Sequence, residues 1–327
     1  MKLPQSDIAM VVSLLVLGVS VTDSAFAQYP VKPVRIIVSV AAGGAPDLAA
    51  RAIAPGLTKA LGQAFVVENR GGANGNIAGQ TVAQAPADGY TLLLAPDSLV
   101  VINRNLYKKL PFDPVKDLAP VASIIRNQFV LAVHPSLPAK TLAEFIDYAR
   151  KAKPPIAYAS AGNGSQHQFL MEMLKARAGI EMLHVPYKGG APAVASVVAG
   201  DTLATFSGGP STAPHVKAGT LRVLASSGTR RAVIMPEVPV VGETFPGYEG
   251  IVWSGIWVPA GTPEAIIRRL HAEINTVLAE TEIRDLFRKS GGSEPFITTP
   301  TEFADIMRRD TEKYLKIISD LKMTAEN

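Results

Sequence analysis

The chain has 327 residues and a formal net charge of +4, and it is 47% hydrophobic but only 18% charged, which is enough apolar material for a sizeable core. Lysine and arginine occur singly or in short pairs such as Lys108-Lys109 and Arg230-Arg231, a pattern that does not support a nucleic-acid interface. The absence of cysteine excludes disulfides, thiolate catalysis and cysteine-based metal sites. None of the five histidines shows H-E-x-x-H spacing, so we expect no metal site built on them.

The first predicted element is a secretory signal peptide. Lys2 precedes an apolar run from Ile8 to Val21, and Ala25-Phe26-Ala27 closes the segment with small residues at both ends of the tripeptide. This order predicts cleavage after Ala27. The run of about 14 residues is shorter than the roughly 20 that span a bilayer, although Asp7 weakens the positive start and leaves an uncleaved anchor as the alternative. We therefore expect an exported protein located in the periplasm.

Strand and helix patterns alternate along the rest of the chain. Short apolar, β-branched runs predict strands at residues 34–40, 65–67, 91–95, 129–133, 156–159, 182–185, 203–206, 221–225 and 255–258. Amphipathic patterns predict helices at residues 47–61, 142–151, 168–178, 191–199, 263–280 and 301–321. This alternation predicts an α/β architecture with parallel-rich sheets covered on both faces.

The length predicts two domains, because about 300 residues remain after the signal peptide. The turn-rich segment Asp113–Asp117 predicts a crossing of the chain near residues 120–128, and Phe245–Gly250 predicts its return. We therefore expect a first lobe of residues 28–125 and 252–327 and a second lobe of residues 126–251. The segment from Pro263 onward is expected to pack its helices on the first lobe.

Three glycine-rich loops each stand between a predicted strand and a helical pattern, at residues 41–47, 68–76 and 160–165. The free N–H groups at a helix start, together with the helix dipole, favour an anion. The plainer interpretations are a tight turn capped by Asp47 for the first loop and a flexible surface loop for the second. Because α/β sheets bind ligands beyond the carboxyl ends of their strands, three such loops facing one crevice would indicate an anion site.

An enzyme is the weaker interpretation. The nucleophile-elbow motif Gly-x-Ser-x-Gly does not occur. Ser160, His167 and Asp201 could be assembled into a triad, but serines and histidines are common residues. A secreted hydrolase that uses Ser160 or Ser165 stays open as an alternative.

Several segments match a known family in order and over nearly the whole chain beyond the signal peptide. They are the stretch from Gly43 to Arg51, the stretch from Glu68 through the following glycines, Asp88-Gly89-Tyr90-Thr91-Leu92, Ser160–Ser165, His184–Gly190 and Pro259-Ala260-Gly261-Thr262-Pro263. With these segments the chain resembles the Bug, or TctC-like, extracytoplasmic solute receptors of tripartite tricarboxylate transport.

The resemblance implies a two-lobed periplasmic-binding-protein fold, type II-like, with a central cleft that holds a small carboxylate by backbone amides and hydroxyls. It implies a monomer that works without a cofactor and delivers its ligand to the membrane permease subunits of a tripartite transporter. Carried onto this sequence, the ligand-binding residues are Ala42, Gly43, Gly44, Ala45, Pro46, Asp47, Ser98, Ser160, Gly162, Asn163, Ser165, Gln168, Tyr187 and Leu203.

Three positions depart from the family pattern. Ala42 stands where proline is usual, and Gln168 stands where histidine is usual, with His167 one place earlier. Leu203 stands where the family carries an aspartate that could engage a ligand ammonium. We therefore expect a ligand without an amino group, unless Leu203 is simply a core residue.

The sequence thus predicts a receptor that captures a small organic acid and releases it unchanged. A sensor that docks on a signalling membrane protein remains an alternative to the transport role.

Overall fold

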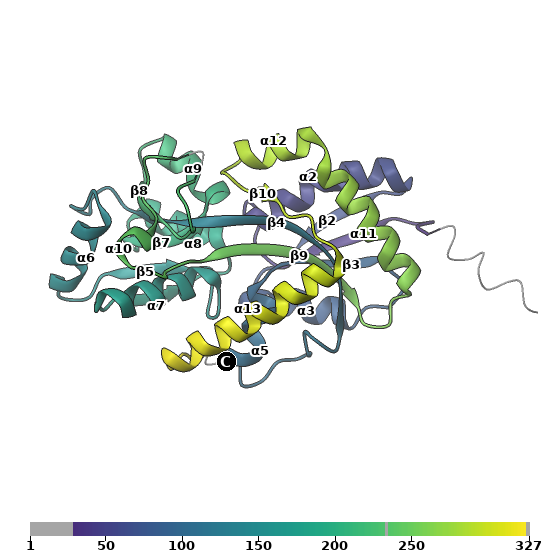
Figure 1. Cartoon of the computed structure of the whole chain (residues 1–327), viewed down its shortest axis with the longest axis horizontal. Coiled ribbons are helices and arrows are strands. Elements are labelled where there is room, and N and C mark those ends of the chain that lie inside the picture. Colours follow the sequence, from purple (N-terminus) through teal and green to yellow (C-terminus); the bar gives the residue numbers. More distant parts are fainter. Residues whose placement is uncertain (1–28, 233–234, 325–327) are drawn as a thin grey trace, which may run out of the picture.

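The computed structural model describes residues 29–232 and 235–324, so the predicted signal peptide and its cleavage site lie outside the described residues. The fold is α/β, as predicted, with helices on both faces of a central curled sheet (Figure 1). Its strands are β1 Val34–Val38, β2 Phe65–Asn69, β3 Thr91–Pro96, β4 Leu118–Val133, β5 Ala157–Ser160, β6 Leu183–Pro186, β7 Ala204–Gly208, β8 Arg222–Ser226, β9 Ile251–Pro259 and β10 Glu294–Pro295. Its helices are α2 Ala45–Leu61, the 3₁₀ turn η2 Ala73–Gly75, α3 Asn76–Ala83, α4 Ser98–Val101, α5 Asn103–Leu106, α6 Leu142–Lys151, α7 Gln166–Ala178, α8 Gly190–Ala199, α9 Gly209–Lys217, α10 Val241–Thr244, α11 Glu264–Ala279, α12 Thr281–Lys289 and α13 Pro300–Asp320.

The sheet has the strand order β2-β1-β3-β9-β4-β7-β5-β6. Its outer strands are parallel, since β1 pairs in parallel with β2 and β3, and β5 pairs in parallel with β6 and β7. The central strands β4 and β9 are antiparallel to each other and to their other neighbours. The sheet is therefore mixed, because the chain crosses the molecule outward on β4 and returns on β9.

Strand β4 changes partners along its length. Residues 118–128 pair with β9, and residues 129–133 pair with β7 and β8 (Figure 1). We call the part on the β9 side lobe 1 and the part on the β7 side lobe 2. The change of partners falls close to the lobe boundaries expected from the sequence, and the assignment of residues 28–125 and 252–327 against 126–251 remains a prediction.

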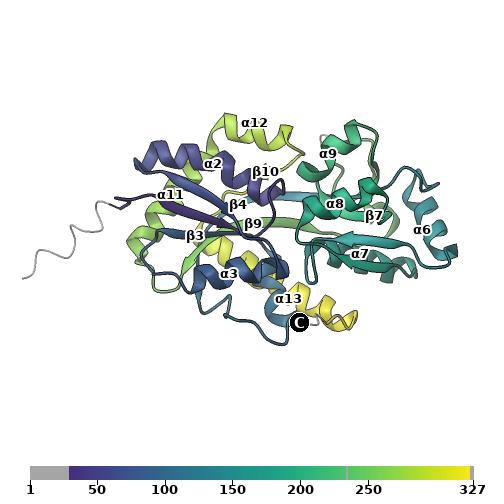
Figure 2. The same ribbon diagram turned by 180° about the vertical axis from the view of Figure 1, so that it is seen from behind.

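Lobe 1 has a core on each face of its sheet. Ile36 of β1 packs in the cluster beneath α2 and α11, whereas its neighbour Ile37 packs in the cluster beneath α3 and α13, because successive strand residues point to opposite faces. Both are fully buried, and burial of such a side chain contributes about 1.5–3 kcal/mol. The C-terminal helices α11, α12 and α13 pack against lobe 1, as expected (Figure 2).

Several helices begin in the region between the two lobes. In lobe 1, β1 leads into α2 and β3 leads into α4; in lobe 2, β5 leads into α7 and β7 leads into α9. Each helix begins beyond the carboxyl end of its strand, so the four helix starts meet between the lobes. Within the described ranges, no helix combines the length and apolar character needed to span a bilayer, and no group of three His, Asp or Glu side chains is placed to hold a metal ion.

Candidate ligand-binding site

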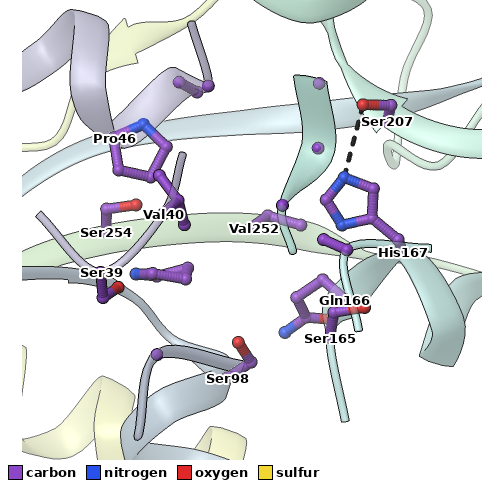
Figure 3. A pocket seen from close by; sticks show the side chains of 18 of the residues that line it. Ser39, Val40, Pro46, Ser98, Ser165, Gln166, His167, Ser207, Val252 and Ser254 are labelled. Carbon is purple, nitrogen blue, oxygen red and sulfur yellow. Dashed lines mark hydrogen bonds between the residues drawn. The ribbon is translucent and has the colours of Figure 1, made fainter. Parts of the chain in front are cut away.

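A cavity of about 60 Å³ lies between the lobes, next to the crossing strands (Figure 3). It is lined mainly by serines, amides, glycines and a few apolar side chains from both lobes. The lining residues are Ser39, Val40, Gly44, Ala45, Pro46, Gly72, Asn74, Gly75, Pro96, Ser98, Asn127, Phe129, Ala161, Ser165, Gln166, His167, Lys188, Gly189, Gly190, Ser207, Gly208, Ser211, Val252 and Ser254.

Four helices of nine or more residues begin at this cavity. The capping residues of α2, α7, α8 and α9 are Gly44, Ser165, Gly189 and Gly208, and all four line it. The first N–H groups of a helix have no partner inside the helix, and they carry the positive end of its dipole. Glycine at three of the caps leaves the backbone open to close approach by a ligand. The cavity therefore presents main-chain donors from both lobes.

Two buried side-chain donors in the lining have no partner within the described structure. Ser39 follows β1 and is 2% exposed, and Asn127 lies on β4 and is 7% exposed. Neither the Ser39 hydroxyl nor the Asn127 side-chain nitrogen makes a hydrogen bond there. Because buried polar groups in folded proteins nearly always have a partner, these two donors are available to a molecule with acceptor oxygens that enters the cavity.

His167 is the one histidine in the lining. Its Nε2 lies 3.4 Å from the Ser207 hydroxyl (Figure 3), and its ring meets Phe129 edge-on with centroids 4.7 Å apart. Burial lowers the pKa of His167 to about 3, so the ring is neutral at pH 7. A neutral imidazole offers one N–H donor and one acceptor without a counter-charge.

The lining carries almost no formal charge. Among the described lining residues there is no aspartate or glutamate, and Lys188, an exposed residue, is the sole charged side chain. A cavity of donors without acidic side chains favours an anion and disfavours an ammonium group. Recognition by helix starts and hydroxyls, rather than by an arginine, fits a small carboxylate.

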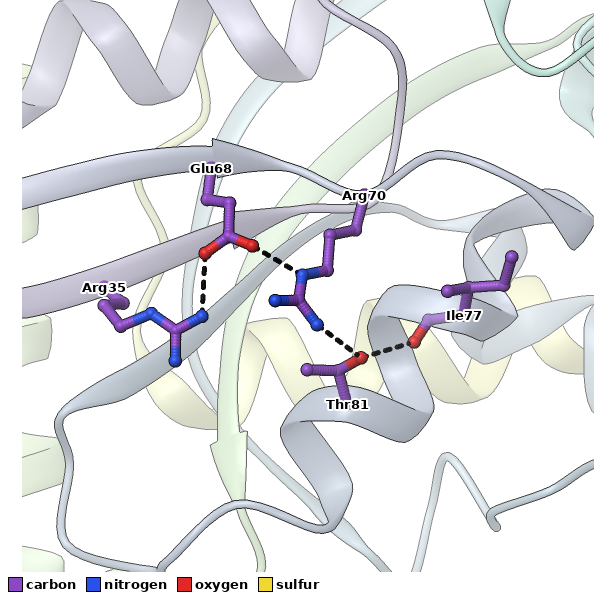
Figure 4. Close-up of polar contacts among 5 residues, drawn as sticks. All are labelled: Arg35, Glu68, Arg70, Ile77 and Thr81. Carbon is purple, nitrogen blue, oxygen red and sulfur yellow. Dashed lines mark hydrogen bonds and ion pairs between the residues drawn. The ribbon is translucent and has the colours of Figure 1, made fainter.

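The second glycine loop is held by a surface network that lies outside the cavity (Figure 4). Glu68 accepts from Arg35 Nη2 at 2.7 Å and from Arg70 Nε at 2.6 Å, and Arg70 Nη1 reaches Thr81 Oγ1 at 3.4 Å. The bond from Arg35 is the main cause that lowers the pKa of Glu68. The network anchors the strand end from which Gly72, Asn74 and Gly75 reach the cavity.

A family model described as "Tripartite tricarboxylate transporter family receptor" matches residues 49–323. The chain belongs to this receptor family. BugT of Bordetella pertussis is 30% identical over 315 residues, which cover 94% of this chain and 96% of BugT. A solved structure described as an R. palustris protein with adipate shares 31% identity at a TM-score of 0.86, covering 90% of this chain and 99% of that one. MatC of Rhodopseudomonas palustris with bound malate shares 27% identity at a TM-score of 0.83, covering 89% and 100%.

These comparisons confirm the resemblance to the Bug and TctC receptors and the periplasmic-binding-protein fold. The family consists of solute-binding receptors rather than enzymes, which confirms the prediction that the chain is not an enzyme.

Five of the site residues predicted from the sequence line the cavity of this receptor: Gly44, Ala45, Pro46, Ser98 and Ser165. The first three start α2, Ser98 starts α4 and Ser165 caps α7. The other predicted residues lie behind the cavity wall, at its margin or away from it.

Asp47 supports the first loop from behind. It is 2% exposed, and its carboxylate accepts hydrogen bonds from Gly43 N at 2.9 Å, Arg51 Nε at 3.0 Å and Asn69 Nδ2 at 2.9 Å. Gly43 itself has a φ of +84°, which favours glycine. Ala42 and Gly43 are exposed and outside the lining, so Asp47 shapes the loop while Gly44 to Pro46 face the cavity.

Ser160 and Gln168 also act behind the wall, around His184. Ser160 is fully buried, and its hydroxyl lies 2.6 Å from His184 Nε2, while Gln168 Nε2 lies 3.4 Å from His184 Nδ1. Gln168 Oε1 also accepts from Gly164 N at 2.7 Å. These bonds hold the third glycine loop. Since Ser160 pairs with His184 rather than His167 and does not reach the cavity, the triad considered from the sequence is not assembled.

The remaining predicted residues lie elsewhere. Gly162, Asn163 and Tyr187 line a neighbouring depression between the lobes, and the Tyr187 hydroxyl donates to Ser196 Oγ at 2.6 Å. Leu203 packs against the core of lobe 2 and does not line the cavity. It precedes β7, whose far end supplies Ser207 to the lining; Ser207 lies four positions along the chain from Leu203, a distance of about 13 Å in an extended strand.

Sequence reasoning missed most of the polar lining outside the glycine loops, including Ser39, Asn127, Gln166 and Ser207, while Asn74 belongs to the second glycine loop and was not singled out there. Ser39 could have been found as the polar residue directly after a buried strand. Asn127 sits within a crossing strand, where no local pattern marks it.

Proposed function

We propose that this protein is a periplasmic receptor that captures a small organic acid without an amino group and delivers it, as a monomer, to the permease subunits of a tripartite transporter. The proposal is carried by the donors in the cavity, which are the starts of four helices and two buried side chains without a partner. Among the described residues of the lining there is no aspartate or glutamate. Such donors bind carboxylate oxygens.

The relatives support this ligand class. Two structural neighbours that share the fold over nearly their whole length hold adipate and malate, which are small acids with two carboxylates. The composition of the lining is the reason to propose a ligand without an amino group. An ammonium would find no carboxylate among the described residues that line the cavity, and Leu203 lies outside the lining.

A ligand screen tests the proposal. We expect adipate, malate or a related acid to raise the unfolding temperature, since a ligand at 100 times its dissociation constant stabilises the fold by about 2.7 kcal/mol. Native mass spectrometry of the same mixtures would show one ligand per chain. Tight binding of aspartate or glutamate would contradict the proposal for the amino group, and failure of all carboxylates would contradict the ligand class.

Two variants tie binding to the cavity. Ser39→Ala and Asn127→Ala each remove a donor that has no protein partner, so we expect little change in the stability of the empty protein. Each should weaken binding of the best acid by about 0.5–1.5 kcal/mol, the net contribution of one hydrogen bond. Unchanged affinity in both would place the ligand elsewhere.

Recovery of the permease from membranes with the loaded receptor, and not with the empty one, would test the transport role.

A further inference from the structure

Gln166 joins the two lobes at the edge of the cavity. It is the first residue of α7 in lobe 2, it is 3% exposed, and it lines the cavity (Figure 3). Both ends of its side-chain amide bond to lobe 1. Nε2 donates to Asp97 Oδ2 at 2.8 Å, and Oε1 accepts from the Tyr314 hydroxyl at 3.0 Å.

Asp97 depends on this contact. The carboxylate is fully buried at the end of β3, and its other oxygen accepts from Ser98 N at 2.7 Å. Burial raises the pKa of Asp97 well above its usual range, and its oxygens are costly to bury unless they are hydrogen-bonded. Separation of the lobes would carry Gln166 away with lobe 2 and leave the Asp97 oxygen that it serves without this donor. The Asp97–Gln166 bond therefore belongs to the closed form.

Tyr314 brings the C-terminal helix into the same contact. It lies on α13, is 3% exposed and does not line the cavity. Its ring meets Phe169 of α7 edge-on, with centroids 5.5 Å apart and planes at 89°. The hydroxyl donates to the amide oxygen while the amide nitrogen donates to Asp97, so Tyr314 and Asp97 together hold the Gln166 amide in one orientation.

We propose that Asp97, Gln166 and Tyr314 form an interlobe latch, in which Gln166 closes the cavity over the ligand while Asp97 and Tyr314 act as positioning residues that orient its amide. The inference rests on the proposed function, since it assigns ligand retention to residues of the same site. It places part of the control of ligand release on a C-terminal helix that never touches the ligand.

A pair of tyrosine variants provides the test. Tyr314→Phe removes the latch hydroxyl and keeps the ring against Phe169. Tyr248→Phe is the matched control: Tyr248 is also buried, and its hydroxyl donates to Leu170 O of the same helix at 2.6 Å, but this contact lies within lobe 2. Dissociation constants and dissociation rates for adipate and malate would be measured together with the unfolding temperature.

We expect Tyr314→Phe to raise the dissociation constant about 5-fold through faster release, the equivalent of one hydrogen bond. Tyr248→Phe should lower the unfolding temperature and leave the dissociation constant unchanged. Gln166→Leu should weaken binding about 50-fold, since it also leaves the Asp97 carboxylate without its amide. If Gln166→Leu does not fold, the tyrosine pair decides. Equal affinities for the two tyrosine variants would overturn the latch.

A second readout separates the latch from the proposed function. Spin labels at Lys59→Cys in α2 and Lys151→Cys in α6, both exposed, would report the distance between lobes in a chain without other cysteines. If no carboxylate of the screen binds the wild type, the proposed function fails, and the latch is judged on the unliganded protein. Tyr314→Phe should then shift the distances toward longer values relative to Tyr248→Phe. Identical distributions would overturn it.

Discussion

A single methyl group at Gly209 should prevent the lobes from closing. Gly209 is the first residue of α9 in lobe 2, and a Cβ built on it would lie 1.7 Å from the carbonyl oxygen of Gly291, in the loop between α12 and β10 of lobe 1. Ordinary contact requires about 3.4 Å, so the two backbones must separate by about 1.7 Å. Because Gly292, the next residue, borders the same depression as Asn127 of the crossing strand β4, this contact lies near the strands that join the two lobes.

The expected effect on binding follows from the donors that would be lost. With the lobes apart, hydrogen bonds of 2.7–3.0 Å lengthen beyond useful range, and the ligand keeps the donors of one lobe only. Loss of two or three bonds at about 1 kcal/mol each raises the dissociation constant about 30- to 160-fold. The fold of the empty protein should keep its stability, because opening relieves the clash.

Gly179→Ala is the matched control for Gly209→Ala. Gly179 ends α7 with a φ of +60°, and a Cβ there meets nothing within 4 Å. This substitution should cost about 1 kcal/mol of folding stability through backbone strain alone and leave binding intact. Calorimetric titration with the best acid from the screen, together with the interlobe distances, would check both variants. Wild-type affinity and closed distances in Gly209→Ala would refute the reasoning.

Three further predictions concern stability. Burial lowers the pKa of His184 to about 4, so the unfolded state binds an extra proton as the pH falls from 6.5 to 4; this group should then cost about 1–2 kcal/mol of stability, less than the full shift implies because the ring is partly exposed. Burial also lowers the pKa of His167, to about 3, so urea titrations of His184→Gln should show a smaller fall with pH than the wild type, not its complete loss. Asp47→Ala breaks three hydrogen bonds to the first loop. The free energy of unfolding, measured by chemical denaturation, should fall by about 2–3 kcal/mol, and ligand binding should weaken. An unchanged denaturation midpoint would show that the loop keeps its conformation without Asp47. Glu68→Gln removes two exposed ion pairs and should cost under about 1 kcal/mol, with the difference shrinking in 1 M salt.

The sequence predicted those parts of the site that have a local signature. Gly44 to Pro46 and Ser165 stand at strand-to-helix junctions, and the junction pattern of apolar strand, small polar loop and helix can be read without knowing the fold. Helix α6 was located to the residue, and the other predicted helices to within two residues at either end, because amphipathic pattern and end signals agree. Such features depend only on neighbours along the chain.

The missed residues depend on contacts between distant parts of the chain. Asn127 and Phe129 belong to a strand that crosses the molecule, and their place in the lining follows from pairing with β9 and β7. Gln166 was left outside the predicted helix, and its partners Asp97 and Tyr314 lie 69 and 148 residues away. No periodicity brings such positions together.

Leu203 shows how a motif position can mislead. It was given a role in selecting the ligand because of the residue type usual at that place. The ligand cavity, however, lies beyond the carboxyl ends of the strands, and Leu203 precedes the amino end of β7. A change of residue type there alters the core of lobe 2 rather than the contacts of the ligand. Specificity must instead be sought at Ser207 and Gly208, at the other end of the same strand.

The distribution of donors between the lobes also bears on release. Partial charges at helix starts bind a carboxylate less strongly than a paired arginine would, and here those of α2 lie in lobe 1 while those of α7, α8 and α9 lie in lobe 2. Neither lobe alone offers the full set. On the proposed function, tight binding therefore requires the donors of both lobes, and separation of the lobes should weaken it. A receptor built in this way can give up an anion without any change in the charge of its own side chains.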